Sequence, residues 1–228
     1  MAREIFRQAL TDGNFVVSLI SEIKDGNFSA AQNDKNILSK NQSELHDGEW
    51  NWLSQEHGDE IVWLESHERA LGIKGDALAT ISSQKIISIT IADCLPLLLT
   101  EQSGIVSLLH LGWRGIERGL LEKTVQLIRK KSDERISAVL GPCIDTCCYE
   151  FDENEMQSLV KKYGEKIVGR TLTGGISLDI RLCVKEILRN FDIDIKYEDS
   201  SCTKCDPRYW SFRADATDKR QVMIAWKE

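Results

Sequence analysis

Most hydrophobic positions of this chain fall into short runs bounded by polar turn residues, which is the pattern of buried strands. The clearest runs, KIISITIA at 85–92 and GIVSLLHL at 104–111, are rich in β-branched residues and too short for independent helices. The polar, poorly patterned stretch 25–48 predicts a loop. Further strands are expected at 15–20, 61–64, 136–140, 195–198 and 221–226, with 209–213 as a candidate partner of the last.

Three segments instead place apolar residues at helical spacing. Residues 116–131 follow a turn predicted at 112–115 and carry Ile116, Leu120, Val125 and Ile128 on one face; 154–163 and 179–191 are the others. Strands and helices without regular alternation predict an α/β (α+β) fold rather than a Rossmann sheet. We expect a layered single domain over residues 1–228, with mixed β-sheets flanked by helices, because no repeat or linker divides the chain.

Composition narrows the class of protein. The 228 residues are 42% apolar and 29% charged, which excludes disordered and collagen-like chains. Acidic residues outnumber basic ones by 36 to 29, and the Lys and Arg are scattered, so we expect no nucleic-acid partner. No window reaches 18 apolar residues and the first twenty lack a signal-peptide pattern, so we expect no membrane association and a cytoplasmic location, where the seven Cys stay reduced.

A Cys and two His are the first candidates for chemistry. His110 lies at the end of one predicted strand, and Cys94 follows the preceding strand just before Pro96, so we expect both at one rim of a sheet. Such a pair makes either a Cys-His nucleophile or part of a zinc site. A third ligand would favour zinc, and His57 is the best candidate because Gly58 frees the backbone beside it.

The remaining cysteines give weaker indications of a metal or catalytic site than Cys94 does. Cys202 and Cys205 have the spacing of half a structural zinc site, but Cys147-Cys148 is a poor substitute for a second C-x-x-C, so this interpretation is not favoured. Cys143 and Cys147 approximate part of the nucleoside deaminase signature with a gap one residue too long. No H-x-E occurs in the chain, which excludes that superfamily.

Four short sequence blocks occur along the chain in an order that can be compared with known families. They are ADCLP at 92–96, HLGWRG at 110–115, the segment from Gly141-Pro142 to CCYE at 147–150, and Cys202-Thr203 followed by SFR at 211–213. In this order they resemble the YfiH-like family, also called the laccase-domain or polyphenol oxidase family. The resemblance extends from Gln55 to the last residue, and the first two blocks together are highly specific.

The resemblance implies a cytoplasmic purine nucleoside phosphorylase acting on adenosine, inosine and methylthioadenosine, with adenosine deaminase activity. It also implies a layered α/β fold with mixed sheets and a zinc ion held by His, Cys and His. By position these ligands are His57, Cys94 and His110, the same residues that the spacing suggested. Purine nucleosides and phosphate are the implied partners, and the assembly is expected to be a monomer or a homodimer.

The chain departs from the family pattern upstream of Gln55. Relatives carry a Gly-Gly-Val-Ser segment and then an Asn-Leu pair, whereas here DGNFS at 25–29 stands for the first and the second is missing. Because that segment contributes to the substrate pocket of relatives, the substrate preference stays open.

Further residues are candidates for single roles. Asp93 is the candidate acid that moves protons during deamination, with a turn or cap carboxylate as the alternative. Phosphorolysis needs fixed cationic donors for phosphate, and Arg114 and then Arg213 are the candidates. A structural Arg114 stacked on Trp113 is the alternative for that residue.

Three other functions compete with phosphorolysis. A multicopper laccase uses about ten His in paired clusters, whereas this chain has four and no H-x-H pair, so polyphenol oxidation and copper are disfavoured. A Cys-His amidase acting on peptidoglycan precursors would use Cys94 as nucleophile and His110 or His57 as base. A metal-dependent binding protein without turnover is the third.

Overall fold

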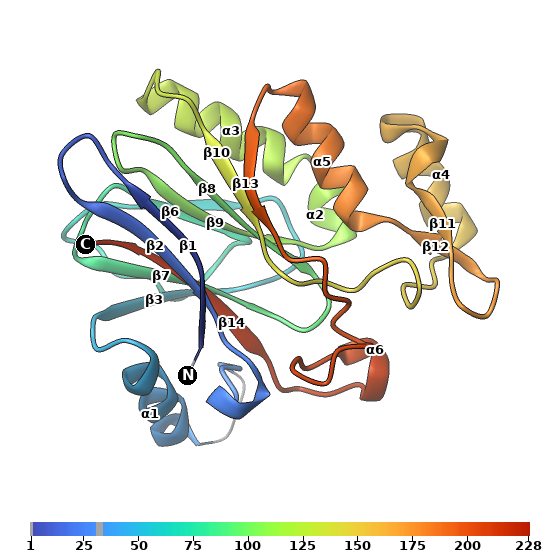
Figure 1. Cartoon of the computed structure of the whole chain (residues 1–228), viewed down its shortest axis with the longest axis horizontal. Helices are drawn as coiled ribbons and strands as arrows, with labels where there is room; N and C mark the ends of the chain where they lie inside the picture. The colour runs from blue at the N-terminus through green and yellow to red at the C-terminus, as the bar shows by residue number, and fades with distance from the viewer. Residues whose placement is uncertain (1, 31–33) are drawn as a thin grey trace.

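Two six-stranded β-sheets stacked face to face form the centre of the molecule in this computed structural model, which describes residues 2–30 and 34–228 (Figure 1). The first sheet has the order β1 (Arg3–Ala9), β2 (Phe15–Ile20), β14 (Gln221–Lys227), β7 (Lys85–Ile91), β3 (Glu49–Ser54) and β5 (Leu71–Lys74). The second has the order β13 (Asp194–Glu198), β10 (Ser137–Leu140), β8 (Leu95–Thr100), β9 (Val106–Leu111), β6 (Ala77–Thr80) and β4 (Ile61–Leu64). A small ribbon pairs β11 (Val168–Arg170) with β12 (Ile176–Leu178).

Both large sheets are mixed, as the sequence predicts. In the first, β14 is antiparallel to β2 and β7 while β3 runs parallel to β7 and β5. In the second, β8 is antiparallel to β9 and β10 while β13 runs parallel to β10.

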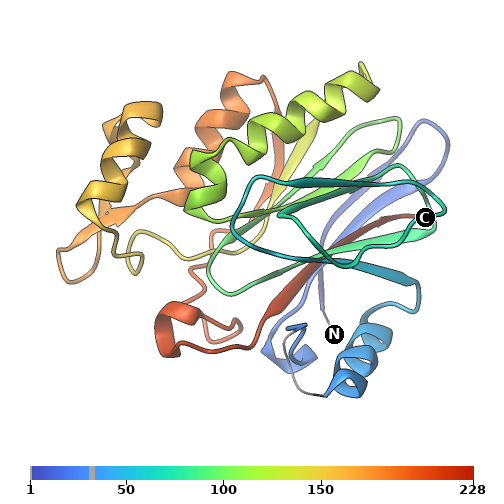
Figure 2. The same cartoon turned by 180° about the vertical axis from the view of Figure 1, so that it is seen from behind.

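Three apolar clusters hold the layers together. The cluster between the sheets joins side chains of β7 and β14, such as Ile89 and Met223, to Leu98 and Leu108 of β8 and β9. The outer face of the second sheet is covered by α3 (Leu120–Lys131) and α5 (Ile180–Asn190), whose apolar stripes include Val125 and Ile187. The outer face of the first sheet is covered by α1 (Lys35–Leu45), seen at the bottom of Figure 2.

Several predicted elements need correction. The predicted loop 25–48 contains α1, whose weakly amphipathic sequence gives little periodic signal. The predicted helix 116–131 is two helices, α2 (Trp113–Glu117) and α3, because Gly119 takes a left-handed conformation with φ +83° between them; the predicted turn 112–115 thus includes the start of α2. Residues 209–213 form no strand, and α6 (Phe212–Asp215) begins within them.

The other two predicted helices are present in the structure. The predicted helix 154–163 is α4 (Glu153–Tyr163) and 179–191 contains α5. Strands β1, β3, β5, β6, β8, β11 and β12 were not predicted. None of the helices in the described residues has the length and apolar character needed to cross a bilayer.

Candidate metal centre

Three side chains from separate segments meet at one end of the stacked sheets. His57 lies on the loop between β3 and β4, Cys94 directly precedes β8, and His110 is the penultimate residue of β9. Their candidate ligand atoms all lie within 4.8 Å of one another. The structure therefore brings together the three residues that the sequence singles out as a ligand set.

The route that positions Cys94 differs from the predicted one. The strand before it, β7, belongs to the first sheet, and β9 with His110 belongs to the second. Cys94 therefore lies where the chain crosses from one sheet to the other, rather than at a rim shared by neighbouring strands. It reaches His110 because it directly precedes β8, in which Pro96 is the register partner of His110.

Asp76 supports the site, and the sequence did not identify it. One carboxylate oxygen of Asp76 lies 2.8 Å from His110 Nδ1. Because this contact occupies Nδ1, the other ring nitrogen, Nε2, is the one left to act as a metal ligand. The same carboxylate accepts hydrogen bonds from the backbone N–H groups of Glu56, His57 and Gly58 at 3.1, 3.0 and 2.7 Å. Asp76 thus orients one candidate ligand and fixes the loop that carries another.

The loop conformation explains why three N–H groups converge there. His57 has φ +57°, which is left-handed and uncommon for a residue with a side chain. Asp76, only 1% exposed, satisfies the backbone donors that this turn leaves inside the protein. Its position directly after Gly75, before β6, is the only sequence signal that marks it.

The charges of Cys94 and His110 support one another. Burial raises the pKa of the Cys94 thiol, but the His110 imidazolium and hydrogen bonds from His110 and His57 lower it to about 6. Burial lowers the pKa of His110, but the Cys94 thiolate and the Asp76 carboxylate raise it to about 9. Burial raises the pKa of Asp76, but the hydrogen bond and charge of His110, together with the backbone N–H groups of Gly58 and Glu56, hold it below its ordinary value. The site therefore favours a Cys94 thiolate beside a His110 imidazolium that the Asp76 carboxylate holds in place.

A glycine gives the three side chains the space they occupy. A Cβ at Gly112 would lie 2.9 Å from His57 Cδ2 and 3.3 Å from Cys94 Sγ. The backbone of Gly112 has φ −80°, so the absence of a side chain, rather than an unusual conformation, is what the site requires. This explains the glycine directly after His110-Leu111.

The donor set fits a borderline-soft transition metal. Zinc is bound in proteins by thiolate sulfur and imidazole nitrogen, and three protein ligands leave a position for a reactant. A carboxylate on the remote nitrogen of a ligand histidine, as Asp76 is placed on His110, is the usual support of such a site. His46 lies instead against Trp226 and His67 is exposed, so neither adds an imidazole.

The three residues form part of the wall of a cavity of about 690 Å³. This volume is within the roughly 300–1,000 Å³ typical of small-molecule sites. Its wall also carries aromatic and cationic side chains, including Trp113, Tyr149, Arg114, Arg213 and Arg220. The cavity can thus contact a planar apolar ligand and an anionic group.

The arginines differ in how firmly they are held. Arg213 donates to the carbonyl oxygen of Glu150 at 2.8 Å and lies over the Tyr149 ring. Arg114 is half exposed, stacks 4.4 Å from the Trp113 ring centroid and lies 3.7 Å from a Glu155 oxygen. Arg220, which the sequence did not suggest, donates to the carbonyl oxygens of Thr217 and Lys219.

Asp93 lines the same cavity but has its carboxylate engaged. One oxygen accepts a hydrogen bond from Thr203 Oγ1 at 2.7 Å, and the other accepts from the backbone N–H of Arg213 at 2.7 Å. The residue has φ +98°, so the backbone is strained beside Cys94. This is the geometry of the cap carboxylate that the sequence offered as the alternative to catalysis.

Comparison with known proteins shows what the chain resembles. Residues 17–228 match the family model described as multi-copper polyphenol oxidoreductase laccase. A purine nucleoside phosphorylase of Aquifex aeolicus is 27% identical over 168 residues, covering 74% of this chain and 78% of the relative. The purine nucleoside phosphorylase YfiH of Shigella flexneri is 28% identical over 178 residues, covering 77% and 72%.

Solved structures share the fold at lower identity. Neisseria meningitidis protein NMB0706 superposes with a TM-score of 0.85 at 19% identity, covering 99% of this chain and 98% of that one. The YlmD protein of Geobacillus stearothermophilus superposes with a TM-score of 0.79 at 23% identity, covering 99% and 100%.

Proposed function

Because the chain belongs to the YfiH-like family, whose model is described as multi-copper polyphenol oxidoreductase laccase, we propose that it cleaves purine nucleosides with phosphate at a zinc site. The single observation that carries the proposal is the convergence of His57, Cys94 and His110 on the wall of a cavity with arginines around it. The relatives named purine nucleoside phosphorylase supply the substrate class.

The metal would be held by His57, Cys94 and His110, with Asp76 orienting His110. Zinc bound there would supply a Lewis acid without redox chemistry. Copper is the disfavoured alternative, since the four His of the chain provide two imidazoles here and no paired cluster.

The arginines would hold the attacking phosphate. In phosphorolysis a phosphate oxygen bonds to the anomeric carbon as the bond from that carbon to the purine nitrogen breaks, and the leaving base takes up a proton. Arg213, held by Glu150 and Tyr149, presents one guanidinium, and Arg114, stacked on Trp113, presents a second on the wall of the same cavity. The planar fork of a guanidinium matches the geometry of phosphate oxygens.

Adenosine deaminase activity is proposed as a second reaction of the same site. Water would add to the purine carbon that bears the amine. The amino group would then take up a proton and leave as ammonia. Asp93 is the nearby acid predicted for the proton transfer. Since both of its oxygens accept hydrogen bonds, we assign it the positioning of Thr203 and Arg213, and keep proton transfer as the alternative.

Nucleoside assays with and without phosphate test the proposal. Inosine, adenosine and methylthioadenosine are incubated with the protein, and release of free base and of ammonia is followed separately. We expect base release that requires phosphate and that disappears in Cys94→Ala. Cys183→Ala, a change of the same kind at a buried cysteine of α5, serves as the control and keeps the activity. Absence of reaction with all three nucleosides would refute the proposal.

One feature of the site favours a second candidate, a Cys-His amidase acting on peptidoglycan precursors. Asp76, His110 and Cys94 form a chain of orienting carboxylate, base and low-pKa thiol, which is the arrangement of a cysteine nucleophile. A zinc-free protein whose amidase activity is lost on alkylation of Cys94 would support this candidate. Stoichiometric zinc with phosphate-dependent base release would reject it.

We also propose the partners, the location and the assembly of the protein. Purine nucleosides and phosphate are the proposed partners, without nucleic acid or membrane, in the cytoplasm, and as a monomer or homodimer.

A further inference from the structure

Four cysteines from two distant loops meet outside the candidate centre. Cys147 and Cys148 lie on the loop between β10 and α4, and Cys202 and Cys205 lie on the segment after β13. Their sulfur atoms all lie within 4.8 Å of one another. The sequence disfavoured this combination because the first pair is adjacent, yet the fold brings all four together.

Backbone contacts hold the two loops side by side. The N–H of Thr203 donates to the carbonyl oxygen of Cys143 at 3.1 Å, and Cys143 and Cys202 form a parallel bridge. The buried guanidinium of Arg181 reaches both loops, lying 3.4 Å from an Asp145 oxygen and 3.3 Å from the carbonyl oxygen of Ser201. The sulfur cluster therefore sits on a preformed frame.

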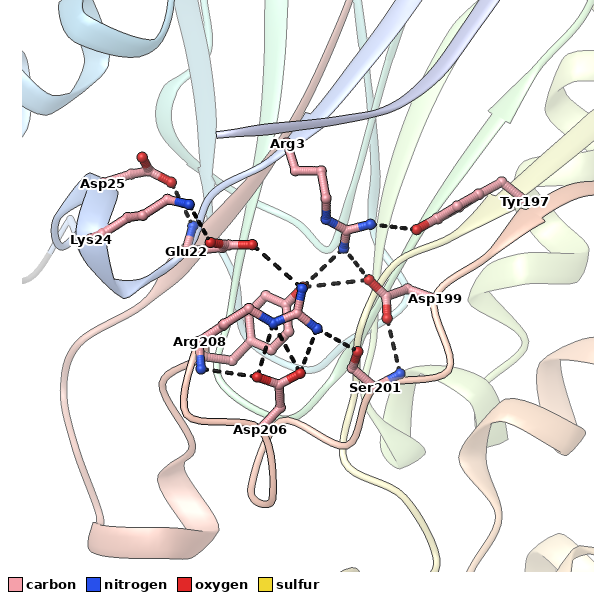
Figure 3. Close-up of polar contacts among 10 residues, drawn as sticks. Arg3, Glu22, Lys24, Asp25, Tyr197, Asp199, Ser201, Asp206 and Arg208 are labelled. Atoms are coloured by element: carbon pink, nitrogen blue, oxygen red, sulfur yellow. Dashed lines mark hydrogen bonds and ion pairs between the residues drawn. The ribbon is translucent and has the colours of Figure 1, made fainter. Parts of the chain in front are cut away.

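The turn that carries Cys202 and Cys205 is closed by its own hydrogen bonds. The N–H groups of Cys205 and Asp206 donate to the carbonyl oxygen of Cys202 at 3.1 and 2.9 Å. Arg208 bonds both carboxylate oxygens of Asp206 and donates to Ser201 Oγ at 3.1 Å, which ties together the ends of the turn (Figure 3). The backbone positions of Cys202 and Cys205 are consequently held relative to one another.

One sulfur of the cluster also accepts a hydrogen bond from a backbone N–H group. The backbone N–H of Asp145 donates to Cys202 Sγ at 3.4 Å. Hydrogen bonds of this kind stabilise a thiolate, which is the form of cysteine that binds a metal.

The spacing of three of the sulfurs matches the edges of a tetrahedron around one ion, and the fourth sulfur, of Cys202, lies within 4.8 Å of each of them. A zinc–sulfur bond of about 2.3 Å places the sulfurs of a tetrahedral four-cysteine site about 3.8 Å apart. Here Cys147 and Cys148 Sγ are 3.6 Å apart, and Cys205 Sγ lies 3.7 Å from the first and 3.3 Å from the second. All four thiols are free, and Cys147 and Cys148 are too close in the chain to bridge each other readily, since neighbouring Cα atoms lie about 3.8 Å apart.

We propose that Cys147, Cys148, Cys202 and Cys205 bind a structural zinc ion that is separate from the His57–Cys94–His110 centre. A disulfide between Cys148 and Cys205 is the competing use of these residues, but it would employ two of the four sulfurs and leave the other two unexplained. A closed four-sulfur site with no position for a reactant is the kind that zinc occupies for structural purposes.

The proposed ion would stiffen one wall of the main cavity. It would join the loop that ends at Glu150, whose carbonyl oxygen anchors Arg213, to the segment of Thr203, whose hydroxyl anchors Asp93. The second zinc site therefore acts at a distance, by holding the two loops that position Arg213. The proposal itself stands on the cysteine geometry and does not depend on the proposed function.

Zinc stoichiometry of the full chain tests the proposal. We expect two zinc ions per chain in protein purified without chelators, and loss of one of them in the Cys202→Ser/Cys205→Ser double variant. Cys94→Ala should lose the other ion, and combining the changes should remove both. Cys183→Ala, which removes a buried thiol outside both groups, should keep two. Retention of two zinc ions by the double variant would overturn the proposal, whatever the nucleoside assays show.

A measurement on the Cys94→Ala protein guards against a double variant that fails to fold. Its remaining zinc is expected to show a first shell of four sulfurs at about 2.3 Å by X-ray absorption. A shell with nitrogen ligands, iron in place of zinc, or a Cys148–Cys205 disulfide found by peptide mapping of zinc-poor protein would each overturn the assignment.

Discussion

At the scale of single residues, the candidate centre depends on two residues that are not themselves candidate ligands of the proposed metal. Asp76 satisfies three backbone N–H groups and His110 at once, and Gly112 leaves the volume in which His57 and Cys94 approach each other. The sequence could suggest the candidate ligands, because the chain has only four His and because thiolate and imidazole have a specific metal chemistry. It could not identify Asp76, because one carboxylate among 36 acidic residues has no distinguishing spacing.

Replacing Asp76 tests its supporting role. Asp76→Asn places an amide N–H₂ against backbone N–H donors and weakens the hold on His110. We expect zinc affinity of the His57–Cys94–His110 centre to fall by about 10–100-fold. Competition with a chromophoric chelator measures this, with Asp133→Asn on the exposed surface as the control. Unchanged affinity would show that His110 needs no carboxylate to bind.

Gly112 offers a purely steric test. Gly112→Ala would bring a Cβ within 2.9 Å of His57 Cδ2, so the His57 ring must move. We expect loss of zinc from this centre and of nucleoside cleavage, with the overall fold retained by circular dichroism. At Gly58 the added Cβ meets its nearest neighbour, an Asp76 oxygen, at an ordinary 3.4 Å, so Gly58→Ala is the matched control. Full zinc content in Gly112→Ala would contradict this account of the glycine.

At the scale of elements, a polar network fastens the edge strand β1 to β13 of the other sheet. Arg3 of β1 bonds Asp199 directly after β13, and it also donates to Tyr197 and Tyr209 at 2.6 and 3.0 Å (Figure 3). Asp199 is 5% exposed and accepts a further bond from the N–H of Ser201 at 2.9 Å. The network connects the first strand of the chain to the segment that leads into the cysteine turn.

The pH dependence of stability tests this network. Burial raises the pKa of Asp199, but bonds from Ser201 and Arg3 lower it below its ordinary value. A carboxylate with a lowered pKa stabilises the fold above its unfolded-state pKa of about 3.9, and this stabilisation is lost as the pH falls through the folded-state pKa. Asp199→Asn should therefore lower the free energy of unfolding by roughly 1–3 kcal/mol at neutral pH.

Urea denaturation at several pH values measures the effect. The difference between Asp199→Asn and the parent should begin to shrink below about pH 4, where the Asp199 carboxyl of the unfolded chain takes up a proton, and should disappear as the pH falls through the lower folded-state pKa. A difference that stays constant from neutral to acidic pH would show that charge is not what Asp199 contributes.

Helices and strands with a strong local periodicity could be predicted from the sequence, whereas those that depend on tertiary contacts could not. The β-branched run of β7 and the amphipathic α5 were identified because each pattern is local. Strand β8 was not predicted. Pro96 lies near its start and donates no N–H to the sheet, but its carbonyl oxygen still accepts a bond from the N–H of Gly141. The α1 helix was missed because it covers only the small outer cluster and needs few apolar positions.

At the scale of the whole molecule, the centre exists because the chain crosses between two sheets. His57 and Cys94 each lie on a link from the first sheet to the second, and His110 lies in strand β9 of the second sheet. Spacing along the sequence could only suggest that these residues meet, and the family resemblance supplied the combination. The four-cysteine cluster shows the opposite case, in which spacing argued against a site that the fold assembles.

We expect the chain to unfold as one unit, as the predicted single domain requires. The cluster between the sheets draws on strands from Ile5 to Ala225, so neither sheet keeps a complete core without the other. Denaturant curves from circular dichroism and tryptophan fluorescence of the metal-loaded protein should coincide. Two separated transitions would indicate independent domains instead.

The central claim is that His57, Cys94 and His110 share one zinc ion in the protein that cleaves nucleosides. Crystals grown from protein with verified phosphate-dependent base release, measured on both sides of the zinc absorption edge, test it most directly. The account predicts an anomalous peak between the three side chains, about 2.0–2.3 Å from their nitrogen and sulfur atoms. Fully active protein whose crystals show no zinc peak at that position would contradict it.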